Sequence, residues 1–545
     1  MMQADAFKQP SPTRLLMTRR RSAIAMALTG FGRCRPSCGS LAKSAHRPVL
    51  VLLPLIASAY LGALCFAATI NNEEQQKSFL PPHWWESASA IRNVSLKDDT
   101  PYPQLSLDPA KAKSQLEAIK KQGFAGIQVF GPADGGKSYN GLDTRDHFRI
   151  EPKYGTVADF AHLVRIAHSL GMAVITFDNL GYSALDAPPF IKACDDVREG
   201  RQSRERQWYF WSDSEEAPPP ATGDHYFFVR PTWMPGYPAE KTEHWVYSER
   251  AKHYYWTRWP GKDANGKTIA LPQYNWRSPE WQNEAEKIVR FWMDTGIDGM
   301  VIDAVNWYVG YTWNNGRRSI TDVINSYGNK YRQPEGGGGF REDPVAWITE
   351  GGWNSVQDYG LSIWWERSHQ ILENAVETGD PRAIEESLRN YHDPVVAGGG
   401  ALNMGFVTIK DHPEQQRLAA AIVATTGHLI TDWSDKDDTM ASDPGVQWLL
   451  QAKAVHPALH QMGVRRRLPT NDDTKYYAFV RSAVESDERV LVVTNFSAAE
   501  QRIHVDLSGL RFNTMVDMQS GESISRAAET QLTVPGLGYR LFQVQ

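Results

Sequence analysis

A repeated order of amphipathic helix, glycine, short apolar strand and polar loop constrains this chain more than any other feature of its sequence. The expected helices cover residues 108–123, 160–171 and 280–296, and a strand is expected directly after each one, at 124–132, 172–179 and 298–305. Units of a helix and a strand that recur in this way are typical of a parallel β-sheet, because each helix returns the chain to the same end of the sheet.

A parallel sheet can stay open or close into a barrel. The length of 545 residues, the several helix–strand units and the acidic residues at strand C-terminal ends favour a closed (β/α)8 barrel of the α/β class. An open, doubly wound sheet would carry a glycine-rich phosphate loop after its first strand. The glycine run at 336–339 lacks the Lys-Ser/Thr pair that a phosphate loop needs. We therefore expect the barrel.

Two segments depart from this alternation. Residues 182–269 are rich in tryptophan, proline and charged residues and contain no clear helix–strand unit, so we interpret them as a subdomain inserted after the third barrel strand. Residues 464–545 alternate apolar and polar residues between turn signals, which predicts a C-terminal antiparallel β domain, a β-sandwich. The barrel with its inserted subdomain is then expected over residues 69–463.

Residues 1–68 read as a leader. Basic residues, among them Lys43 and Arg47, precede an uncharged apolar run at 49–70. This order is typical of a cleaved export signal, with cleavage near Ala67 or Ala68. The run is also long enough to remain as a membrane anchor. Either outcome predicts that the rest of the chain is exported, to the periplasm or out of the cell.

The composition excludes some partners and leaves others open. A net charge of -5 and a pI near 6.3 argue against nucleic acid, because no basic excess exists to neutralise phosphates. The 19 tryptophans and 21 tyrosines suit stacking on sugar rings, and they suit a large aromatic core equally well. Cys194 is the one cysteine after the leader, so that part of the chain can form no internal disulfide and no cysteine-based metal site.

Three acids follow apolar runs that we expect to be strands. They are Asp303, Glu350 and Asp411. The C-terminal ends of the strands of a parallel barrel open into one shared mouth, so acids placed there can act together. One carboxylate, one protonated carboxyl group and a third acid that steadies positive charge are what glycoside hydrolysis requires. Each acid taken alone could equally be a helix N-cap or part of a loop salt bridge.

The residues around these acids resemble the α-amylase family, glycoside hydrolase family 13, nearest to its oligo-1,6-glucosidase, α-glucosidase and trehalose synthase branches. "TGIDGMVIDAV" is similar to the family's second conserved region, "ITEGGW" to its third and "FVTIKDHP" to its fourth. The resemblance covers about residues 80–545. It implies that Asp303 is the nucleophile, Glu350 the general acid/base and Asp411 the acid that stabilises the transition state.

Some family positions carry other residues here. Val301 stands where the family has an arginine, and Phe177 and Tyr182 stand where it has aspartate and histidine. A guanidinium beside a carboxylate favours its ionised form, whereas burial beside a valine favours the neutral form. Lys410, at a family histidine, is our candidate for a replacement positive charge, and the alternative is a solvent-facing lysine.

Other positions are candidates for contact with a sugar. Asp143 matches an aspartate that the family keeps, and we expect it to bind substrate together with Tyr182, Lys410 and Trp307. Packing within a barrel loop is the alternative role for Trp307. We predict no metal, because Gly181 replaces the asparagine that often binds calcium in the family, and we predict no cofactor.

The resemblance implies a retaining glycosidase, with either water or a second sugar as acceptor, that cleaves an α-glycosidic bond through a covalent glycosyl-enzyme, and the leader implies that it is exported. The expected partner is an oligosaccharide or another α-glycoside, and the sequence does not indicate an oligomeric state. The alternative is a family member that keeps the barrel, has lost turnover and acts in carbohydrate binding or as a scaffold. The lost arginine and histidines favour that alternative, and the three retained acids favour the enzyme.

Overall fold

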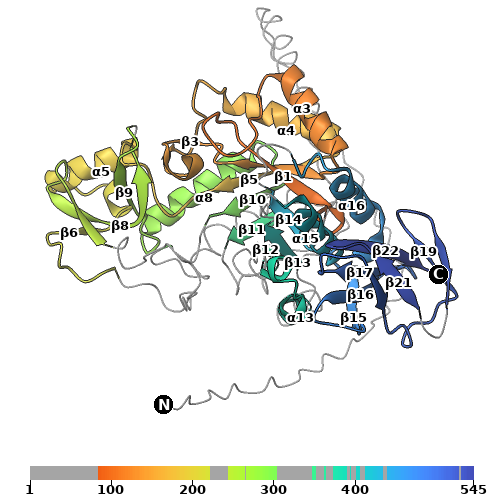
Figure 1. The fold of residues 1–545 in the computed structure, drawn as a ribbon. Coiled ribbons are helices and arrows are strands. Elements are labelled where there is room, and N and C mark those ends of the chain that lie inside the picture. Colours follow the sequence, from red (N-terminus) through yellow and green to blue (C-terminus); the bar gives the residue numbers. More distant parts are fainter. Residues whose placement is uncertain are drawn as a thin grey trace, which may run out of the picture. The chain divides into compact units, whose positions relative to one another are not determined.

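The computed structural model describes residues 84–220, 244–263, 265–303, 308, 346–350, 361–363, 372, 374–389, 393, 401–405, 412–433, 439–526 and 530–545. Eight parallel strands within these residues form a closed barrel (Figure 1), so the expected barrel is confirmed. In chain order the strands are β1 (Ala90–Val94), β2 (Gly126–Phe130), β5 (Ala173–Asp178), β10 (Gly299–Ile302), β11 (Ala346–Glu350), β12 (Leu361–Ile363), β13 (Ala401–Gly405) and β14 (Leu429–Trp433). The ring closes at β1, which pairs with both β2 and β14.

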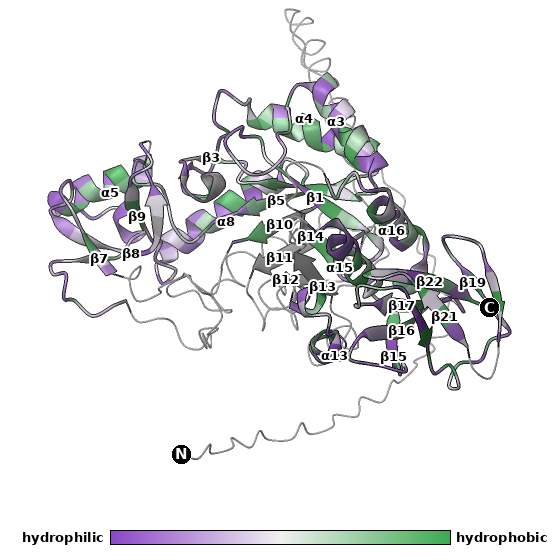
Figure 2. Ribbon diagram, in the orientation of Figure 1, coloured by the Kyte–Doolittle hydropathy of each residue, from purple (hydrophilic) through white to green (hydrophobic). Residues whose placement is uncertain are grey.

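Alternate residues of the barrel strands enter two different cores. Val301 of β10 packs with Ile175 of β5 inside the barrel. Ile302, the next residue, packs outside the barrel against the helix side chains Phe160 and Trp292. This alternation follows from the two-residue period of a strand. Figure 2 shows hydrophobic residues along β10, whereas the surrounding helices mix hydrophobic and hydrophilic residues.

Helices between the strands begin at the side chains that the sequence offers as caps. The expected helices are present as α3 (Pro109–Lys121), α4 (Val157–Ser169) and α8 (Pro279–Met293). Each starts behind a capping residue, which is Asp108, Thr156 or Ser278, and such caps satisfy backbone N–H groups that the first turn leaves unpaired. The described barrel region also contains α2 (Trp84–Ser87), α13 (Arg382–Ser387), α15 (Pro413–Thr425), α16 (Pro444–Val455) and the short η7 (Pro457–Leu459).

The chain between β5 and α8 forms an antiparallel sheet with two helices instead of another helix–strand unit. Its elements are α5 (Pro188–Arg198), α6 (Arg204–Gln207), β6 (Trp211–Ser212), β7 (His244–Ser248), β8 (His253–Lys262) and β9 (Thr268–Pro272). Strand β8 pairs with all three others. A smaller hairpin, β3 (Asp134–Gly135) and β4 (Thr144–Asp146) with the turn η1 (Ser138–Gly141), follows β2. The boundaries at 182 and 269 stay predictions.

The end of the chain is antiparallel, as expected. Six strands form one sheet in the order β15 (Val464–Leu468), β16 (Tyr476–Ser482), β17 (Arg489–Asn495), β22 (Gly538–Val544), β19 (Thr514–Asp517) and β20 (Ser523–Ser525), and β18 (Gln501–His504) pairs with β21 (Gln531–Val534). Tyr477, Phe479 and Val492 of the large sheet pack in one core with Leu418 and Leu449 of α15 and α16. Its other face forms a second core with β18 and β21.

The leader lies outside the described residues, so its role stays a prediction. Across the part of the chain that the structure describes, no helix has the length and the apolar character that a membrane span requires.

Arg481 ties the C-terminal sheet to the barrel. Its side chain is fully buried in β16, and its guanidinium donates hydrogen bonds to the carbonyl oxygens of Ala458 (3.0 Å), Thr426 (3.1 Å) and His460 (2.5 Å). Gly427 allows this approach, because a Cβ atom there would lie 2.5 Å from a guanidinium nitrogen. A planar group with five donors can satisfy several carbonyls at once, which a lysine cannot do.

We predict that Arg481→Leu lowers the free energy of unfolding by about 3 kcal/mol, because two buried carbonyl oxygens and one partly buried carbonyl oxygen lose a charged donor. Chemical denaturation measures the change. Arg502→Leu is the matched control, since Arg502 is an exposed arginine of β18, and its effect should stay within about 0.5 kcal/mol. Equal effects of the two substitutions would contradict the role of Arg481.

Candidate functional site

Two aspartates flank β10 and have different environments. Asp298, before the strand, is buried against His168, whose Nε2 lies 2.8 Å from its Oδ2, and the backbone N–H of Val174 donates to the same oxygen. Asp303, after the strand, is partly exposed and accepts a hydrogen bond from the Tyr182 hydroxyl at 3.4 Å. Asp298 is therefore a structural acid, and Asp303 is the acid at the barrel mouth.

Glu350 ends the strand next to β10. In the parallel pairing of β10 with β11, Ile302 lies opposite Thr349. Asp303 directly follows Ile302, and Glu350 directly follows Thr349. The backbones of these two acids therefore lie on neighbouring strands at the same end of the barrel. The side chain of Glu350, and all of Trp307, Lys410 and Asp411, lie outside what the structure describes. Their roles stay predictions.

The loops that carry Asp143 and Tyr182 are tied together by Asn179. Its side-chain amide donates to the carbonyl oxygens of Leu142 (2.9 Å) and Tyr182 (2.8 Å). The structure therefore brings the loops of Asp143 and Tyr182 to the end of the barrel where Asp303 lies. Sequence reasoning missed Asn179. Its position directly after β5 and two residues before a glycine is the signal that could have found it.

Burial sets the protonation of Asp143. Its side chain is 2% exposed, and it accepts a hydrogen bond from the backbone N–H of Ser138 at 3.0 Å. Removal from water raises the pKa of Asp143 to about 7, although this backbone hydrogen bond and the nearby charge of Lys97 act against the rise. A carboxyl group with this pKa can donate as well as accept hydrogen bonds near neutral pH, which suits contact with sugar hydroxyls.

Lys97 is a buried cation beside Asp143 that sequence reasoning also missed. It follows β1 and donates from Nζ to the carbonyl oxygen of Gly141 at 3.2 Å. Glycines make room for it, because a Cβ atom would lie 2.0 Å from Nζ at Gly141 and 3.1 Å from it at Gly135. Burial lowers the pKa of Lys97 to about 8. The glycine-rich stretch "DGGKSYNGLD" was the available signal, since it implies a backbone that wraps closely around other groups.

Two of the departures from the family pattern are neighbours in space. Val301 of β10 and Phe177 of β5 are register partners in adjacent strands. Both pack in the core inside the barrel, where the Phe177 ring stacks on Phe130 with ring centroids 4.4 Å apart. The arginine and aspartate that the family has at these positions would be opposite charges on adjacent strands. Their joint replacement by apolar residues leaves neither charge buried without the other.

Asp178 does not take the place of the missing aspartate. It follows Phe177 in β5, so the alternation of the strand turns its side chain to the opposite face from Phe177. Its carboxyl group is buried, and burial raises the pKa of Asp178 to about 7. We find no cluster of three or more histidine, cysteine, aspartate or glutamate side chains fit to hold a metal ion among the residues that the structure describes.

We predict that Lys97→Met shifts the ionisation of Asp143 to higher pH by on the order of one unit, because a nearby positive charge favours the carboxylate. Burial raises the pKa of Asp143 from 3.8 to about 7. The Asp143 carboxyl group should therefore lower the free energy of unfolding progressively as pH rises between these two pKa values. The loss should level off near pH 7, the folded-state value. The difference in free energy of unfolding between the protein and its Asp143→Asn variant measures this curve.

In the Lys97→Met background the same difference should level off at higher pH. Lys137→Met is the control, because Lys137 is an exposed lysine of the same loop. An unchanged curve in the Lys97→Met background would show that Lys97 does not control the protonation of Asp143.

Two segments of the chain match known family models. Residues 112–335 match the family model described as α-amylase, catalytic domain, and residues 466–541 match the maltogenic amylase C-terminal domain. A probable oligo-1,6-glucosidase 3 of Bacillus subtilis is 28% identical over 224 residues, which are 41% of this chain and 36% of that protein. A trehalose synthase of Thermus thermophilus is 32% identical over 166 residues, which are 30% of this chain and 14% of that protein. The matched region thus spans about a third or less of these relatives.

The fold agrees with solved structures. The α-amylase of Geobacillus thermoleovorans, crystallised with acarbose, aligns with 85% of this chain and 99% of its own, with a TM-score of 0.58 and 13% sequence identity. The catalytic-domain match includes the segment around Asp303, whereas Glu350 lies outside both matched segments. Residues 112–335 and 466–541 of this chain are thus similar to the catalytic domain and a C-terminal domain of the α-amylase family, glycoside hydrolase family 13.

Proposed function

We propose that this chain is a retaining glycosidase that cleaves an α-glucosidic bond, with Asp303 as nucleophile and Glu350 as general acid/base. The observation that carries the proposal is the pairing of β10 with β11, in which these two acids follow directly on the partners Ile302 and Thr349. Neighbouring strands lie about 4.8 Å apart. Retaining glycosidases need about 5–5.5 Å between their two carboxyl groups. Acids at adjacent strand ends suit this distance.

The other residues at the mouth support the same chemistry. In the proposed reaction Asp303 attacks the anomeric carbon while Glu350 gives its proton to the leaving oxygen, and Glu350 then takes a proton from the incoming water or sugar. The hydroxyl of Tyr182 donates to Asp303 and steadies the carboxylate before attack. Asp143 binds sugar hydroxyls, and Asp411 steadies the positive charge of the transition state.

The substrate we propose is a short oligosaccharide or another α-glucoside. The names of the relatives, oligo-1,6-glucosidase and trehalose synthase, favour an α-linked glucose unit. The apolar pair Val301 and Phe177 gives the inner part of the barrel fewer polar groups than the family pattern provides. We therefore expect fewer hydrogen bonds to the innermost sugar and a correspondingly high KM.

We predict that Asp303→Asn lowers kcat at least about a thousandfold, because the amide cannot form the covalent intermediate. The assay uses p-nitrophenyl α-glucoside together with malto- and isomalto-oligosaccharides. Asp294→Asn is the matched control, since Asp294 is an exposed aspartate that precedes the opposite end of the same strand, and it should leave kcat within about twofold.

The outcomes separate the two functions. Turnover in the parent and its loss in Asp303→Asn alone support the glycosidase. Turnover that survives Asp303→Asn excludes Asp303 as nucleophile. No turnover by either protein, combined with measurable oligosaccharide binding, would favour the binding protein.

We also propose that the chain is exported. The support is the order of basic residues, the apolar run at 49–70 and the small residues Ala67 and Ala68. Expression of the full chain in a bacterium should yield exported protein whose N-terminus, read by Edman sequencing, begins just after Ala67 or Ala68. Uncleaved chain in the membrane fraction would favour the anchor, and uncleaved chain in the cytoplasm would contradict export.

A further inference from the structure

The loop 179–182, which follows β5, carries Tyr182, whose hydroxyl donates to the proposed nucleophile. Its two middle residues, Leu180 and Gly181, are buried, and the N–H and carbonyl groups of both have partners. Because an unpaired buried backbone group costs free energy, such a loop can shift only if its partners shift with it. These partners therefore decide where the Tyr182 hydroxyl lies.

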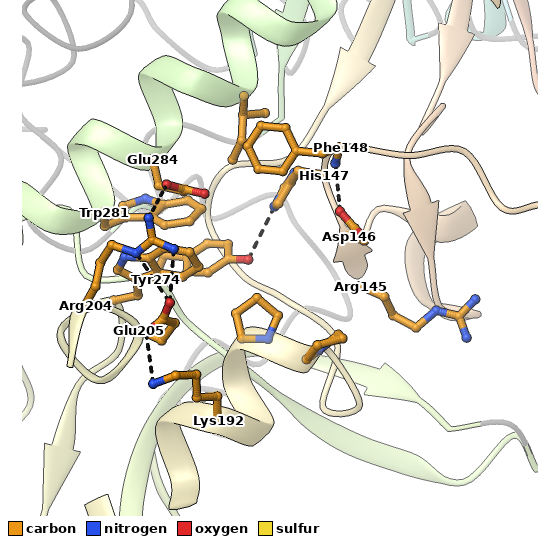
Figure 3. Close-up of a pocket in the computed structure, with 14 residues that line it drawn as sticks. Arg145, Asp146, His147, Phe148, Lys192, Arg204, Glu205, Tyr274, Trp281 and Glu284 are labelled. Atoms are coloured by element: carbon orange, nitrogen blue, oxygen red, sulfur yellow. Dashed lines mark hydrogen bonds and ion pairs between the residues drawn. The ribbon is translucent and has the colours of Figure 1, made fainter. Parts of the chain in front are cut away.

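On one side the loop is held by a wall of aromatic residues. The Tyr274 backbone N–H donates to the carbonyl oxygen of Gly181 at 2.8 Å. The Trp276 indole N–H donates to the carbonyl oxygen of Leu180 at 2.9 Å. Tyr274 stacks on Trp281 with ring centroids 3.5 Å apart, and Figure 3 shows both rings in the wall of the cavity between α5, α6 and α8. This side of the loop is fixed, because the rings that hold it are packed against one another.

On the other side the loop is held by Tyr308, which belongs to the segment that begins at Asp303. The Tyr308 hydroxyl accepts a hydrogen bond from the Leu180 N–H at 3.0 Å and lies 3.5 Å from the Oδ1 atom of Asn179. Gly181 makes room for the ring, because a Cβ atom there would lie 2.2 Å from the Tyr308 Cε1 atom. One side chain from the segment after β10 thus packs directly on the loop after β5.

These contacts close a ring between the two segments. The loop after β5 reaches the segment after β10 through Tyr182, whose hydroxyl donates to Asp303 at 3.4 Å. The segment after β10 reaches back through Tyr308. The two segments are also joined where they start, because the Asp303 N–H donates to the carbonyl oxygen of Asp178 at 2.8 Å. A displacement of Tyr308 would therefore move the Tyr182 hydroxyl relative to Asp303.

We propose that Tyr308 is a positioning residue for the proposed reaction, which holds the loop after β5 so that the Tyr182 hydroxyl stays against Asp303. The link to catalysis rests on the proposed function, whereas the link to Tyr182 rests on the contacts alone. Tyr308 is 4% exposed, so it acts through the loop and not by contact with a sugar. The hydrogen bond from Tyr182 to Asp303 is already longer than usual, so a small displacement is enough to break it.

A double-mutant cycle tests the link between Tyr308 and Tyr182 without any need for turnover. The free energy of unfolding is measured by chemical denaturation for the parent, Tyr182→Phe, Asp303→Ala and the combined variant. The two substitutions should be non-additive in the parent, because each removes the same hydrogen bond. In the Tyr308→Phe background the Leu180 N–H loses its acceptor. The same two substitutions should become additive there.

Tyr255→Phe is the matched control background. Tyr255 is another buried tyrosine, and its hydroxyl donates to the backbone carbonyl oxygen of Ala270 at 2.9 Å. The coupling should survive in this background. Gly181→Ala reaches the contact from the other side, because its methyl group would displace the Tyr308 ring, and it should abolish the coupling as Tyr308→Phe does. Circular dichroism shows whether each variant is folded.

Kinetics with p-nitrophenyl α-glucoside test the link to catalysis. Tyr182→Phe and Tyr308→Phe should each lower kcat about tenfold, the effect expected from one lost hydrogen bond to a charged group. The double variant should lose no more than either single variant. Tyr308→Phe should change KM less than about twofold, because it removes no contact with the bound sugar. Tyr255→Phe should leave kcat and KM unchanged.

Two results would overturn the proposal. The first is a coupling between Tyr182 and Asp303 that is absent from the parent or that persists in a folded Tyr308→Phe or Gly181→Ala background. The second is a loss of kcat in the double variant that equals the product of the two single losses. Absence of turnover in the parent would instead contradict the proposed function, and the coupling would still decide the role of Tyr308.

Discussion

The register between β5, β10 and β11 is the constraint on which the rest of the site depends. Parallel strands in a closed ring must end at the same rim, and the pairing of Ile302 with both Asp178 and Thr349 fixes which residues leave the rim side by side. A slip of one residue would turn Val301 out of the barrel and Ile302 into it, and would carry Asp303 away from Tyr182. The cores on the two sides of the strands oppose such a slip, because each accepts only its own set of apolar side chains.

The same register pairs the two positions inside the barrel where this chain has apolar residues and the family pattern has charged ones. Val301 and Phe177 lie side by side on adjacent strands, so a change at one position alters the environment of the other. An arginine left without its aspartate, or the reverse, would be a buried charge without a partner, which costs more than the loss of both. In this barrel both positions are apolar, and Phe177 contacts Phe130. Lys97 provides a positive charge elsewhere at the rim, held between glycines beside Asp143.

Much of the fold could be predicted from the sequence, and the reasons for the exceptions are physical. Helices α3, α4 and α8 have capping residues and a regular apolar face, so their positions were predictable within a few residues. Strand β12 has only three residues, too few to show a period. Motifs mark Asp303, Tyr182 and Asp143 in the sequence, and their roles stay predictions, whereas Lys97 and Asn179 make contacts between loops that meet only in the folded chain. The cavity between α5, α6 and α8 depends on contacts between elements that no single sequence window contains.

The buried guanidinium of Arg481 has a consequence for how this protein could evolve. A β domain at the end of a chain can often be exchanged between proteins by recombination, because few contacts cross the junction. Here, in addition to the apolar core that the sheet shares with α15 and α16, one buried side chain satisfies carbonyl oxygens contributed by two different segments of the barrel. Any incoming domain without an arginine at this position would leave those oxygens dehydrated and unpaired. The two parts of the chain are therefore expected to have been inherited together.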